Sequence, residues 1–335
     1  MKKIYSLVAA LLLCGSLFAQ DTFSIIAVDP ATGEVGSAGA SCVTGVGAGG
    51  IIDIITDIIP GKGGVNSQAY VCIPNTNLQN AILRMEEGLS PQEIIDWLLL
   101  NDSCGSQNFD PAFRQYGVAD LDSAGDPRTA GWTGNMADDY KEDRQGSNFS
   151  VQGNILLDVS VIDNMEANFN NTNGTLADKL MAAMQGANFA GADSRCLANG
   201  TSSTTAYLLV YRADDDPNDP YLRLNVGQQS AGIEPIDILQ DLYDNFLAAE
   251  DFELDNKLTL FPNPATSELT LAVDPSVRLT KLSIIDINGK NIETQTNLNL
   301  AATQQKLNIA QLPSGIYFLK VESDEGATSI KFVKQ

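Results

Sequence analysis

Residues 22–41 read TFSIIAVDPATGEVGSAGAS. It begins with a mostly apolar run from Thr22 to Val28. The turn-forming residues Pro30 to Gly33 follow, and residues 34–41 again combine small and apolar side chains. Two such runs around a short turn signal predict a hairpin, in which Thr22 is the first residue of the first strand.

The rest of the first 250 residues mixes strand and helix patterns. Apolar side chains recur at helical spacing in several segments, and one segment opens with Ser90, Pro91 and Glu93, the sequence of a capping box. Helices are predicted for residues 78–88, 90–100, 160–169, 175–186 and 235–249, a hairpin for 114–134, and strands for 148–156, 205–212 and 221–227. Hairpins with paired helices between them indicate antiparallel sheets covered by helix layers, an α+β architecture.

The composition changes near residues 250–257, after which only short alternating segments remain. Turn signals separate these segments, among them Asn288-Gly289 and Pro313-Ser314-Gly315. They predict a small all-β, immunoglobulin-like sandwich. The expected organisation is a signal peptide over residues 1–19, a first domain over 20–250, a linker over 251–257 and a second domain over 258–335.

The N-terminal segment has the features of a secretory signal peptide. Lys2 and Lys3 precede an apolar core at residues 7–13, and Ala19 is the small residue that signal peptidase prefers before the cleaved bond. The core is too short to cross a bilayer, and no later stretch approaches the roughly 18 apolar residues that a membrane span needs. We expect a secreted or cell-surface protein without a membrane span.

The charge of the chain is strongly negative and unevenly distributed. The formal net charge is −22; residues 21–255 hold ten Lys and Arg against 35 Asp and Glu, whereas residues 256–335 hold eight against seven. Such an acidic surface repels nucleic acids and anionic membranes, so neither is an expected partner. Histidine is absent, which excludes a Ser-His-Asp triad, a Cys-His dyad and a His-ligated zinc.

Four cysteines follow the signal peptide: Cys42, Cys72, Cys104 and Cys196. An even number in an oxidising compartment predicts two disulfides, with four buried free thiols as the alternative. The three possible pairings stay open. No Cys-x-x-Cys spacing occurs, so neither a zinc site nor a redox centre is predicted, and no cofactor is assigned.

Residues 213–220, ADDDPNDP, form an acidic loop. Its carboxylates, which are of the type that binds Ca²⁺, belong to Asp214, Asp215, Asp216 and Asp219. Their spacing does not match an EF-hand loop, and the two prolines favour a solvated turn. A calcium site, and with it an adhesin function, is kept only as an alternative to a protein without a metal site.

The second predicted domain carries four motifs in order: LFPNPA at 260–265, IIDINGK at 284–290, LPSGIYF at 312–318 and KFVK at 331–334. In sequence, spacing and position it resembles the type A C-terminal sorting domain of the type IX secretion system of Bacteroidetes. The resemblance implies that residues 258–335 engage the type IX secretion machinery for export across the outer membrane. Removal of the tail and release or anchoring at the cell surface would follow.

The first predicted domain carries a second series of motifs: TFSI at 22–25, DPATGE at 29–34, GLSP at 88–91, RQYGV at 114–118, WTG at 132–134, VQGNIL at 151–156 and YLRLNV at 221–226. Residues 22–248 thereby resemble the DUF1028 proteins, which are placed near the N-terminal nucleophile (Ntn) hydrolases. The resemblance implies the four-layer αββα sandwich of those enzymes. The activity of the family is not established, so the resemblance implies a fold more than a reaction.

The Ntn resemblance makes Thr22 the candidate nucleophile. A hydroxyl is a poor nucleophile at neutral pH unless a base lies beside it, and the chain has no histidine. An N-terminal threonine uses its own α-amine, whose ordinary pKa of about 8 suits proton transfer. We therefore predict that Thr22, once it is the first residue, attacks an amide carbonyl in a peptide, a peptidoglycan fragment or another small amide.

Six further residues are candidates to support this chemistry, three pairs with three roles. They are Gln152 and Asn154 for stabilising the oxyanion, Asp29 and Ser41 at the ends of the first hairpin for orienting the amine, and Asp193 and Arg195 for pairing with each other or binding substrate.

Two features of the sequence keep a second interpretation open. Cleavage of the signal peptide leaves Gln20 and Asp21 ahead of Thr22, whose nitrogen is then an amide without basicity, so a second cut after Asp21 is required. The chain also has Cys42 where the family often has a basic residue, and it carries an inserted segment after Arg195. The alternative is a catalytically inactive Ntn-like module for surface binding or structure. The substrate and the oligomeric state stay open.

Overall fold

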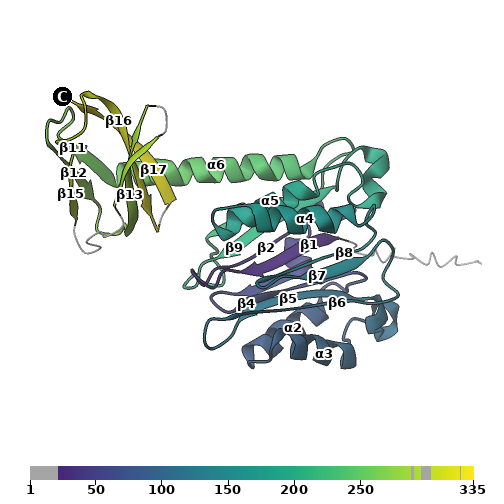
Figure 1. Ribbon diagram of the computed structural model, residues 1–335. Coiled ribbons are helices and arrows are strands. Elements are labelled where there is room, and N and C mark those ends of the chain that lie inside the picture. Colours follow the sequence, from purple (N-terminus) through teal and green to yellow (C-terminus); the bar gives the residue numbers. More distant parts are fainter. Residues whose placement is uncertain (1–21, 288–289, 296–302, 325) are drawn as a thin grey trace, which may run out of the picture. The chain divides into compact units, whose positions relative to one another are not determined.

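The computed structural model describes residues 22–287, 290–295, 303–324 and 326–335 (Figure 1). The chain divides into two compact units, of which the first ends at Asp241 and the second begins at Leu242. Among the described residues, no helix is both long and apolar enough to cross a bilayer. The predicted signal peptide lies outside the described residues.

Two antiparallel sheets form the centre of the first unit. The six-stranded sheet has the order β10-β9-β2-β1-β8-β7, and the four-stranded sheet has the order β3-β4-β5-β6. The strands are β1 (Phe23–Val28), β2 (Val35–Ser41), β3 (Thr56–Ile59), β4 (Gly63–Gln68), β5 (Gln115–Leu121), β6 (Pro127–Thr133), β7 (Glu142–Gln145), β8 (Phe149–Gly153), β9 (Thr205–Tyr211) and β10 (Leu222–Val226). The hairpin predicted at residues 22–41 is present as β1 and β2, in the middle of the larger sheet.

Helices cover the outer face of each sheet, so the layers run helix, sheet, sheet, helix (Figure 1). The six-stranded sheet is covered by α4 (Ser160–Asn171) and α5 (Leu176–Gly186), and the four-stranded sheet by α2 (Thr76–Glu86) and α3 (Pro91–Leu100). The capping box predicted at Ser90 and Glu93 is present at the start of α3. The short helices are η1 (Gly47–Gly49), α1 (Ile52–Ile55), η2 (Ser106–Phe109), η3 (Pro111–Phe113) and η4 (Ser194–Asn199).

The layer between the two sheets changes in character along β1. Alternate residues of a strand share a face, and those of β1 that face the four-stranded sheet become polar towards its start. Ile26 and Val28 belong to an apolar cluster, whereas Ser24 donates a hydrogen bond to Gln68 of β4. Apolar packing therefore holds the turn end of the hairpin, while buried polar side chains collect at the other end, next to Thr22.

Two disulfides settle the pairing that the sequence left open. Cys42, directly after β2, is bonded to Cys196 in η4, and Cys72, after β4, is bonded to Cys104. The first bond joins positions 154 residues apart and the second joins positions 32 residues apart. Both therefore cross-link loops that lie far apart in the sequence.

The second unit contains most of α6 (Pro235–Asn256) and, after it, the predicted all-β region. One sheet has the order β11-β12-β15 and the other β14-β13-β16-β17, and a cluster that includes Leu271, Ile284 and Phe332 forms the core. The strands are β11 (Leu258–Phe261), β12 (Glu268–Val273), β13 (Leu279–Asp286), β14 (Asn291–Gln295), β15 (Gln304–Asn308), β16 (Gly315–Ser323) and β17 (Gly326–Lys334).

The helix α6 is longer than the one predicted for residues 235–249. It continues to Asn256 and so includes residues 251–256 of the expected linker. The extension has a simple cause, because no glycine or proline interrupts the sequence between Pro235 and Asn256. The predicted Asn288-Gly289 turn lies outside the described residues.

Candidate functional site

Thr22 directly precedes β1, whose neighbours in the sheet are β2 and β8, and it is completely buried. Its backbone nitrogen donates a hydrogen bond to Asn154 Oδ1 at 3.2 Å. Its carbonyl oxygen accepts from the backbone nitrogen of Asn154 at 3.1 Å and from Gln68 Nε2 at 2.8 Å. Thr22 is thus held by the residue that follows β8 and by a side chain from the opposite sheet.

The contact from Gln68 belongs to a buried polar network between the sheets. Gln68 Oε1 accepts from Ser24 Oγ at 2.6 Å, and Gln68 Nε2 also donates to Gln115 Oε1 at 2.8 Å. Gln152 Nε2 donates to Ser24 Oγ at 2.6 Å. These four side chains are completely buried, and a buried polar group without a partner costs about 1–3 kcal/mol. The hydrogen bonds of the network therefore offset the energetic cost of burying polar side chains beneath Thr22.

Asp193 is a buried carboxylate with both oxygens engaged. Oδ1 accepts from Arg195 Nε at 2.9 Å and from its backbone nitrogen at 3.2 Å, while Oδ2 accepts from Arg195 Nη2 at 2.6 Å and from the backbone nitrogen of Cys42 at 2.8 Å. Arg195 Nη2 also lies 3.4 Å from Ser41 Oγ. The Arg195 side chain is 30% exposed, so a partly accessible cation is fixed by a buried acid.

The strand register brings this ion pair to Thr22. Phe23 is paired with Ala40, so Ser41 is the next residue of β2, at the position across from Thr22. On the other side, Asp193 forms an isolated bridge with Leu156, just beyond β8. The predicted residues gathered at this end of the six-stranded sheet are Thr22, Ser41, Asn154, Asp193 and Arg195.

Two other predicted residues do not reach the amine of Thr22. Asp29 follows β1 at its opposite end, about 20 Å away along the strand, and its carboxylate accepts from the backbone nitrogen of Ala31 at 2.9 Å within the hairpin turn. Gln152 lies nearer, but its side chain points into the layer between the sheets, where Oε1 accepts from Ser150 Oγ at 3.1 Å. Strand alternation explains this orientation, since Gln152 is paired with the inward-facing Ser24.

The acidic loop is a hydrogen-bonded turn. Asp215 Oδ2 accepts from the backbone nitrogens of Arg212 and Tyr221 at 2.8 and 2.7 Å. Asp216 accepts from the backbone and side chain of Asn218, which lowers the pKa of the Asp216 carboxyl. Among the described residues, no three Asp, Glu, Cys or His side chains converge to hold a metal ion. The carboxylates of Asp215 and Asp216 thus serve the turn itself.

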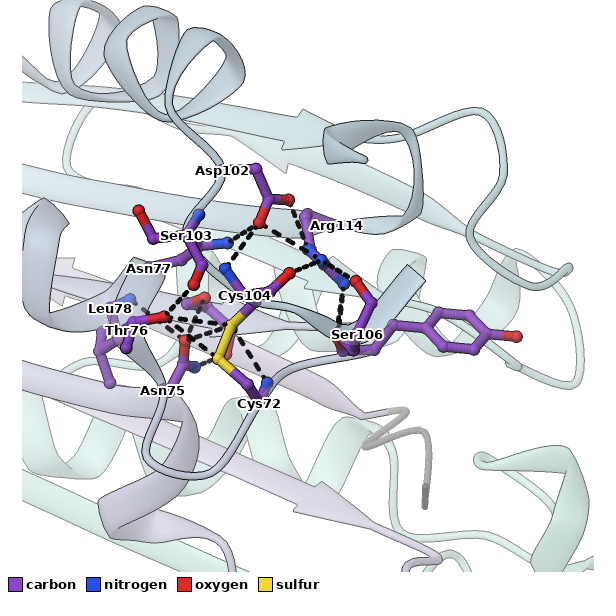
Figure 2. The surroundings of a disulfide bond; sticks show 12 residues. Cys72, Asn75, Thr76, Asn77, Leu78, Asp102, Ser103, Cys104, Ser106 and Arg114 are labelled. Carbon is purple, nitrogen blue, oxygen red and sulfur yellow. Dashed lines mark hydrogen bonds and ion pairs between the residues drawn. A yellow bond between two sulfur atoms is a disulfide. The ribbon is translucent and has the colours of Figure 1, made fainter. Parts of the chain in front are cut away.

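A buried ion pair lies beside the Cys72–Cys104 disulfide (Figure 2). Arg114 and Asp102 are each 1% exposed, with Arg114 Nε 2.7 Å from Asp102 Oδ2. Arg114 Nη2 also donates to the carbonyl oxygens of Cys104 and Ser106 at 3.0 and 2.6 Å. The charged pair is thereby compensated by carbonyl groups of the loop that it holds.

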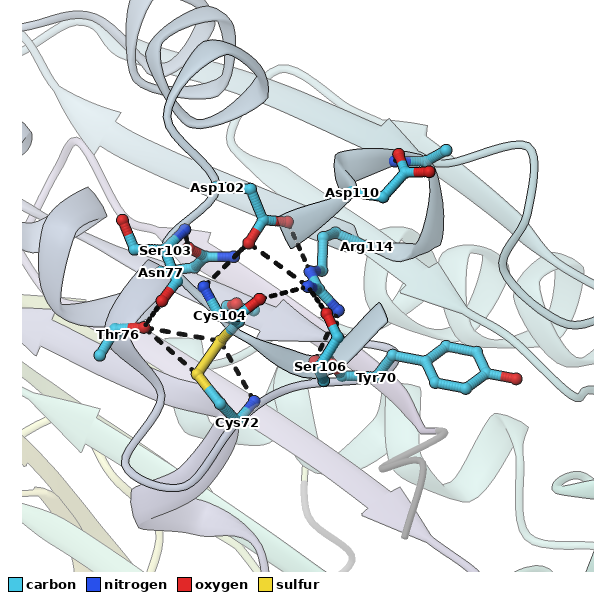
Figure 3. A network of polar contacts seen from close by, with 12 residues as sticks. Tyr70, Cys72, Thr76, Asn77, Asp102, Ser103, Cys104, Ser106, Asp110 and Arg114 are labelled. Carbon is cyan, nitrogen blue, oxygen red and sulfur yellow. Dashed lines mark hydrogen bonds and ion pairs between the residues drawn. A yellow bond between two sulfur atoms is a disulfide. The ribbon is translucent and has the colours of Figure 1, made fainter. Parts of the chain in front are cut away.

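The same cluster fixes Tyr70. Arg114 Nη1 donates to the Tyr70 carbonyl at 2.5 Å, and Ser106 Oγ donates to the same oxygen. Tyr70 has a φ of 51°, in the left-handed region that is unfavourable for a bulky residue. Figure 3 shows its ring pointing away from the ion pair, and its hydroxyl donates to Asp138 Oδ2 at 2.6 Å. Such a conformation persists only where the surroundings enforce it, and here the arginine does so.

No role is predicted from sequence for Gln68, Tyr70, Asp102 or Arg114. Arg114 lies in the RQYGV motif, which is the only sequence feature that marks any of these four residues. The motif does not indicate which residues Arg114 contacts. The distance in sequence between Gln68 and Thr22 is too large for any spacing rule. Their contact exists only because two sheets are stacked.

A separate pocket of about 220 Å³ lies on the four-stranded sheet. It is lined by residues of β3 and of the start of α2, among them Asp57, Asn75 and Leu78, and its lining does not include Thr22. Burial raises the pKa of the Asp57 carboxyl. The Asn75 side chain is already engaged with the carbonyl oxygens of Ile54 and Ser67. The pocket is therefore no part of the candidate site.

The comparisons with known proteins agree with both resemblances. Residues 22–236 match the model of a family of unknown function, DUF1028, and residues 259–335 match the secretion system C-terminal sorting domain. No curated protein shows detectable similarity to the chain.

Among solved structures, the first unit is similar to the crystal structure of a Silicibacter pomeroyi protein described by the DUF1028 family model. That protein is 24% identical, the match covers 67% of this chain and 88% of that chain, and the TM-score is 0.52, which supports a shared fold. The sorting domain implies the type IX secretion machinery and indicates export to the cell surface or secretion. The chain therefore belongs to the DUF1028 family and ends in a secretion-system sorting domain.

Proposed function

We propose that the first unit is an exported amidohydrolase of the Ntn type, with Thr22 as its nucleophile. The contact that carries this proposal is the 3.2 Å hydrogen bond from the nitrogen of Thr22 to Asn154 Oδ1. A neutral α-amine at this position donates one N–H to Asn154 and turns its lone pair away from that acceptor. The stacking of two sheets between helix layers supports the assignment of an Ntn-hydrolase-like fold.

In the proposed reaction, Thr22 Oγ1 attacks the carbonyl carbon of a substrate amide while the α-amine takes the hydroxyl proton. The C–N bond of the substrate then breaks, and the amine passes the proton to the departing nitrogen. This leaves an ester on Thr22. Water, deprotonated by the same amine, attacks the ester carbonyl, and the bond from the acyl carbon to Thr22 Oγ1 breaks. The amine returns the proton to Oγ1, and a carboxylic acid is released. One amine handles every proton, so the reaction needs no histidine.

The neighbouring polar residues have supporting roles in this proposal. Asn154 orients the amine through its side-chain oxygen, in addition to the role in oxyanion stabilisation predicted from sequence. Arg195 is the partly exposed cation at the end of β2, and it binds a carbonyl or carboxylate group of the substrate. Asp193 holds the guanidinium in place, and Ser41 links it to the strand across from Thr22. Peptides and peptidoglycan fragments carry both kinds of group.

The proposal requires two processing events before Thr22 is free. Signal peptidase removes residues 1–19, and a second cut after Asp21 exposes the amine. We further propose that the second unit, with an immunoglobulin-like fold over residues 258–335, directs export in a member of the Bacteroidetes and is then removed. In this proposal the first domain comprises residues 20–250, and residues 251–257 connect it to the sorting domain.

The test is the mature N-terminus together with the activity of Thr22 variants. The protein is purified from the medium or cell surface, and intact mass identifies its first residue. Periodate cleaves a 1,2-amino alcohol, so it oxidises Thr22 only when its amine is free. We expect hydrolysis of a peptide or peptidoglycan amide that is lost in Thr22→Ala and retained in part in Thr22→Ser, with exposed Thr32→Ala as the control. Full activity in Thr22→Ala rejects the mechanism.

The complete burial of Thr22 favours a second candidate, a catalytically inactive module for surface binding or structure. In this case Thr22 is simply the residue before β1, and its backbone contacts with Gln68 and Asn154 stabilise the sheet. The mature protein would then begin before Thr22 in every fraction. It would also resist acylation by a β-lactone, an electrophile that a positioned N-terminal threonine opens.

A further inference from the structure

We propose that Gln68 is a positioning residue for Thr22, which it controls from the opposite sheet. This inference rests on the proposed function. Gln68 ends β4, is completely buried, and places Nε2 2.8 Å from the Thr22 carbonyl oxygen. Gln68 does not touch the reacting atoms in this arrangement. It acts through the backbone to which both the amine and the hydroxyl of Thr22 are attached.

The Thr22 carbonyl is constrained from two directions. A carbonyl oxygen has two lone pairs, and this one accepts from Gln68 Nε2 and from the backbone nitrogen of Asn154, at 2.8 and 3.1 Å. Both donors belong to rigid elements, one at the end of β4 and one directly after β8. Fixing the carbonyl plane fixes the ψ angle of Thr22. The direction in which its amine and side chain leave Cα is set as a consequence.

The network also determines which way round the Gln68 amide lies. Ser24 Oγ receives hydrogen bonds from Asn66 Nδ2 at 3.0 Å and from Gln152 Nε2 at 2.6 Å. A hydroxyl accepts two hydrogen bonds and donates one, so the proton of Ser24 goes to Gln68 Oε1 at 2.6 Å. The NH₂ group of Gln68 must therefore face Thr22. The orientation follows from the count of donors and acceptors around Ser24.

The residues around the network leave space for these amides. A Cβ at Gly117 of β5 would lie 2.0 Å from Gln152 Oε1, so a larger residue there would displace the Gln152 amide from its present position. Gln115, the second acceptor of Gln68 Nε2, donates in turn to the carbonyl of Gly153 at 2.9 Å, next to Asn154. Both donors to the Thr22 carbonyl are thus linked through one buried chain of contacts.

The expected signature of this role is a slower chemical step with unchanged binding. The hydrogen bonds described for the Gln68 side chain are with Thr22, Ser24 and Gln115, and not with Arg195 or Asp193, the residues assigned to substrate binding. Loss of the Gln68 donor should therefore reduce the rate constant of acylation by about 10- to 100-fold, the range expected for a misplaced reacting group. The probe concentration that gives half the maximal rate should stay within about two-fold, since binding does not depend on that alignment.

The experiment uses full-length exported protein and a β-lactone probe. Thr22 Oγ1 attacks the lactone carbonyl, the ring C–O bond breaks, and the proton passes through the amine to the ring oxygen. Intact mass follows the acyl-enzyme over time at several probe concentrations. The variants are Gln68→Met, which removes both donor hydrogens, and isosteric Gln68→Glu, which supplies a second variant if the first does not fold.

The matched control is Ser37→Ala. Ser37 is equally buried and lies in the same network, where it contacts Asn66 and Tyr207 at 2.8 and 2.9 Å, but it has no contact with Thr22 among those described. The midpoint temperature of thermal unfolding of Ser37→Ala should fall by about as much as that of the Gln68 variants. Its rate of acylation should stay at the wild-type value. A general loosening of the network would instead slow both sets of variants alike.

The outcomes separate this inference from the function on which it rests. Slow acylation in the Gln68 variants alone, with unchanged probe binding, supports the positioning role. If wild type and the Gln68 variants acylate equally fast, Gln68 is structural and the hydrolase proposal stands. If periodate and intact mass show that Thr22 is never the first residue of the wild-type protein, the proposed function fails, and this inference fails with it.

Discussion

The backbone nitrogen of Thr22 lies 3.2 Å from the side-chain oxygen of Asn154, the residue that follows β8. The acceptor is a neutral amide and not a carboxylate. A neutral acceptor orients an amine without stabilising its charged form as strongly as an acid would. In the proposed mechanism, this neutral acceptor leaves the amine of Thr22 available as a base at neutral pH.

Asn154→Asp should shift the pH dependence of Thr22 acylation upwards. A carboxylate beside the α-amine favours the ammonium form and raises the pKa of the amine, so the neutral base appears only at higher pH. We expect the midpoint of the rate profile with a β-lactone to rise by about one pH unit. Asn148→Asp is the control, because Asn148 contacts the Val28 carbonyl at the far end of β1. An unshifted midpoint in Asn154→Asp would remove Asn154 from the site.

Asp102→Asn should destabilise the first unit strongly. It leaves the guanidinium of Arg114 buried without its counter-charge, and breaking a buried pair in this way costs about 3–5 kcal/mol. The exposed pair of Arg223 and Asp53 provides the comparison, for which Asp53→Asn should cost at most about 1 kcal/mol. Urea denaturation followed by tryptophan fluorescence measures both. Similar losses in the two variants would contradict the structural importance of the buried pair.

Removal of the Cys42–Cys196 disulfide should cost more stability than removal of Cys72–Cys104. The loops closed span 154 and 32 residues. Chain entropy then predicts about 5 and about 4 kcal/mol for the two double serine variants. Equilibrium unfolding of each variant without reductant gives the comparison. The reverse order would mean that strain or residual structure, and not loop length, dominates.

Glu34→Gln should stabilise the protein at neutral pH but not in acid. Burial, followed by the charge of Asp29, raises the pKa of the Glu34 carboxyl. Its ionisation therefore opposes folding, and the cost appears as pH rises through the raised pKa. The melting temperature of the variant should exceed that of wild type at pH 7, and the difference should vanish below about pH 4.

Glu93→Gln is the control for Glu34→Gln, because the pKa of Glu93 is shifted in the opposite direction. Hydrogen bonds from the Ser90 side chain and backbone lower the pKa of the Glu93 carboxyl. The stability from its ionised form is present above the unfolded pKa and is lost as pH falls through the lowered one. Glu93→Gln should therefore lower the melting temperature at pH 7 and have little effect in strong acid. Equal behaviour of the two variants would contradict both assignments.

Most of the fold could be predicted from local patterns. The β1–β2 hairpin, the capped start of α3 and the all-β second unit all have strong short-range signals. The strands β3, β4 and β7 had none. β4 reads GGVNSQ, in which two glycines precede Val65 and polar residues follow it, yet all six residues are buried. Asn66 and Gln68 can lie in a buried strand because Ser24 on the opposite sheet bonds both side chains. Ser67 points the other way, and its partner is Asn75 at the start of α2.

The features of the candidate site likewise fall into two groups, those predictable from local sequence and those that depend on packing. The sorting domain, the lack of a histidine base and a strand starting beside Thr22 could be predicted from the sequence, because composition, motif order and turn signals are local properties. Strand pairing and sheet stacking were needed to show that Gln68 and Asn154 hold Thr22, that Arg195 and Asp193 lie at the same end, and that Asp29 does not. Hydrogen bonds between stacked sheets join residues that no spacing relates, so strand register and packing alone determine which side chains meet.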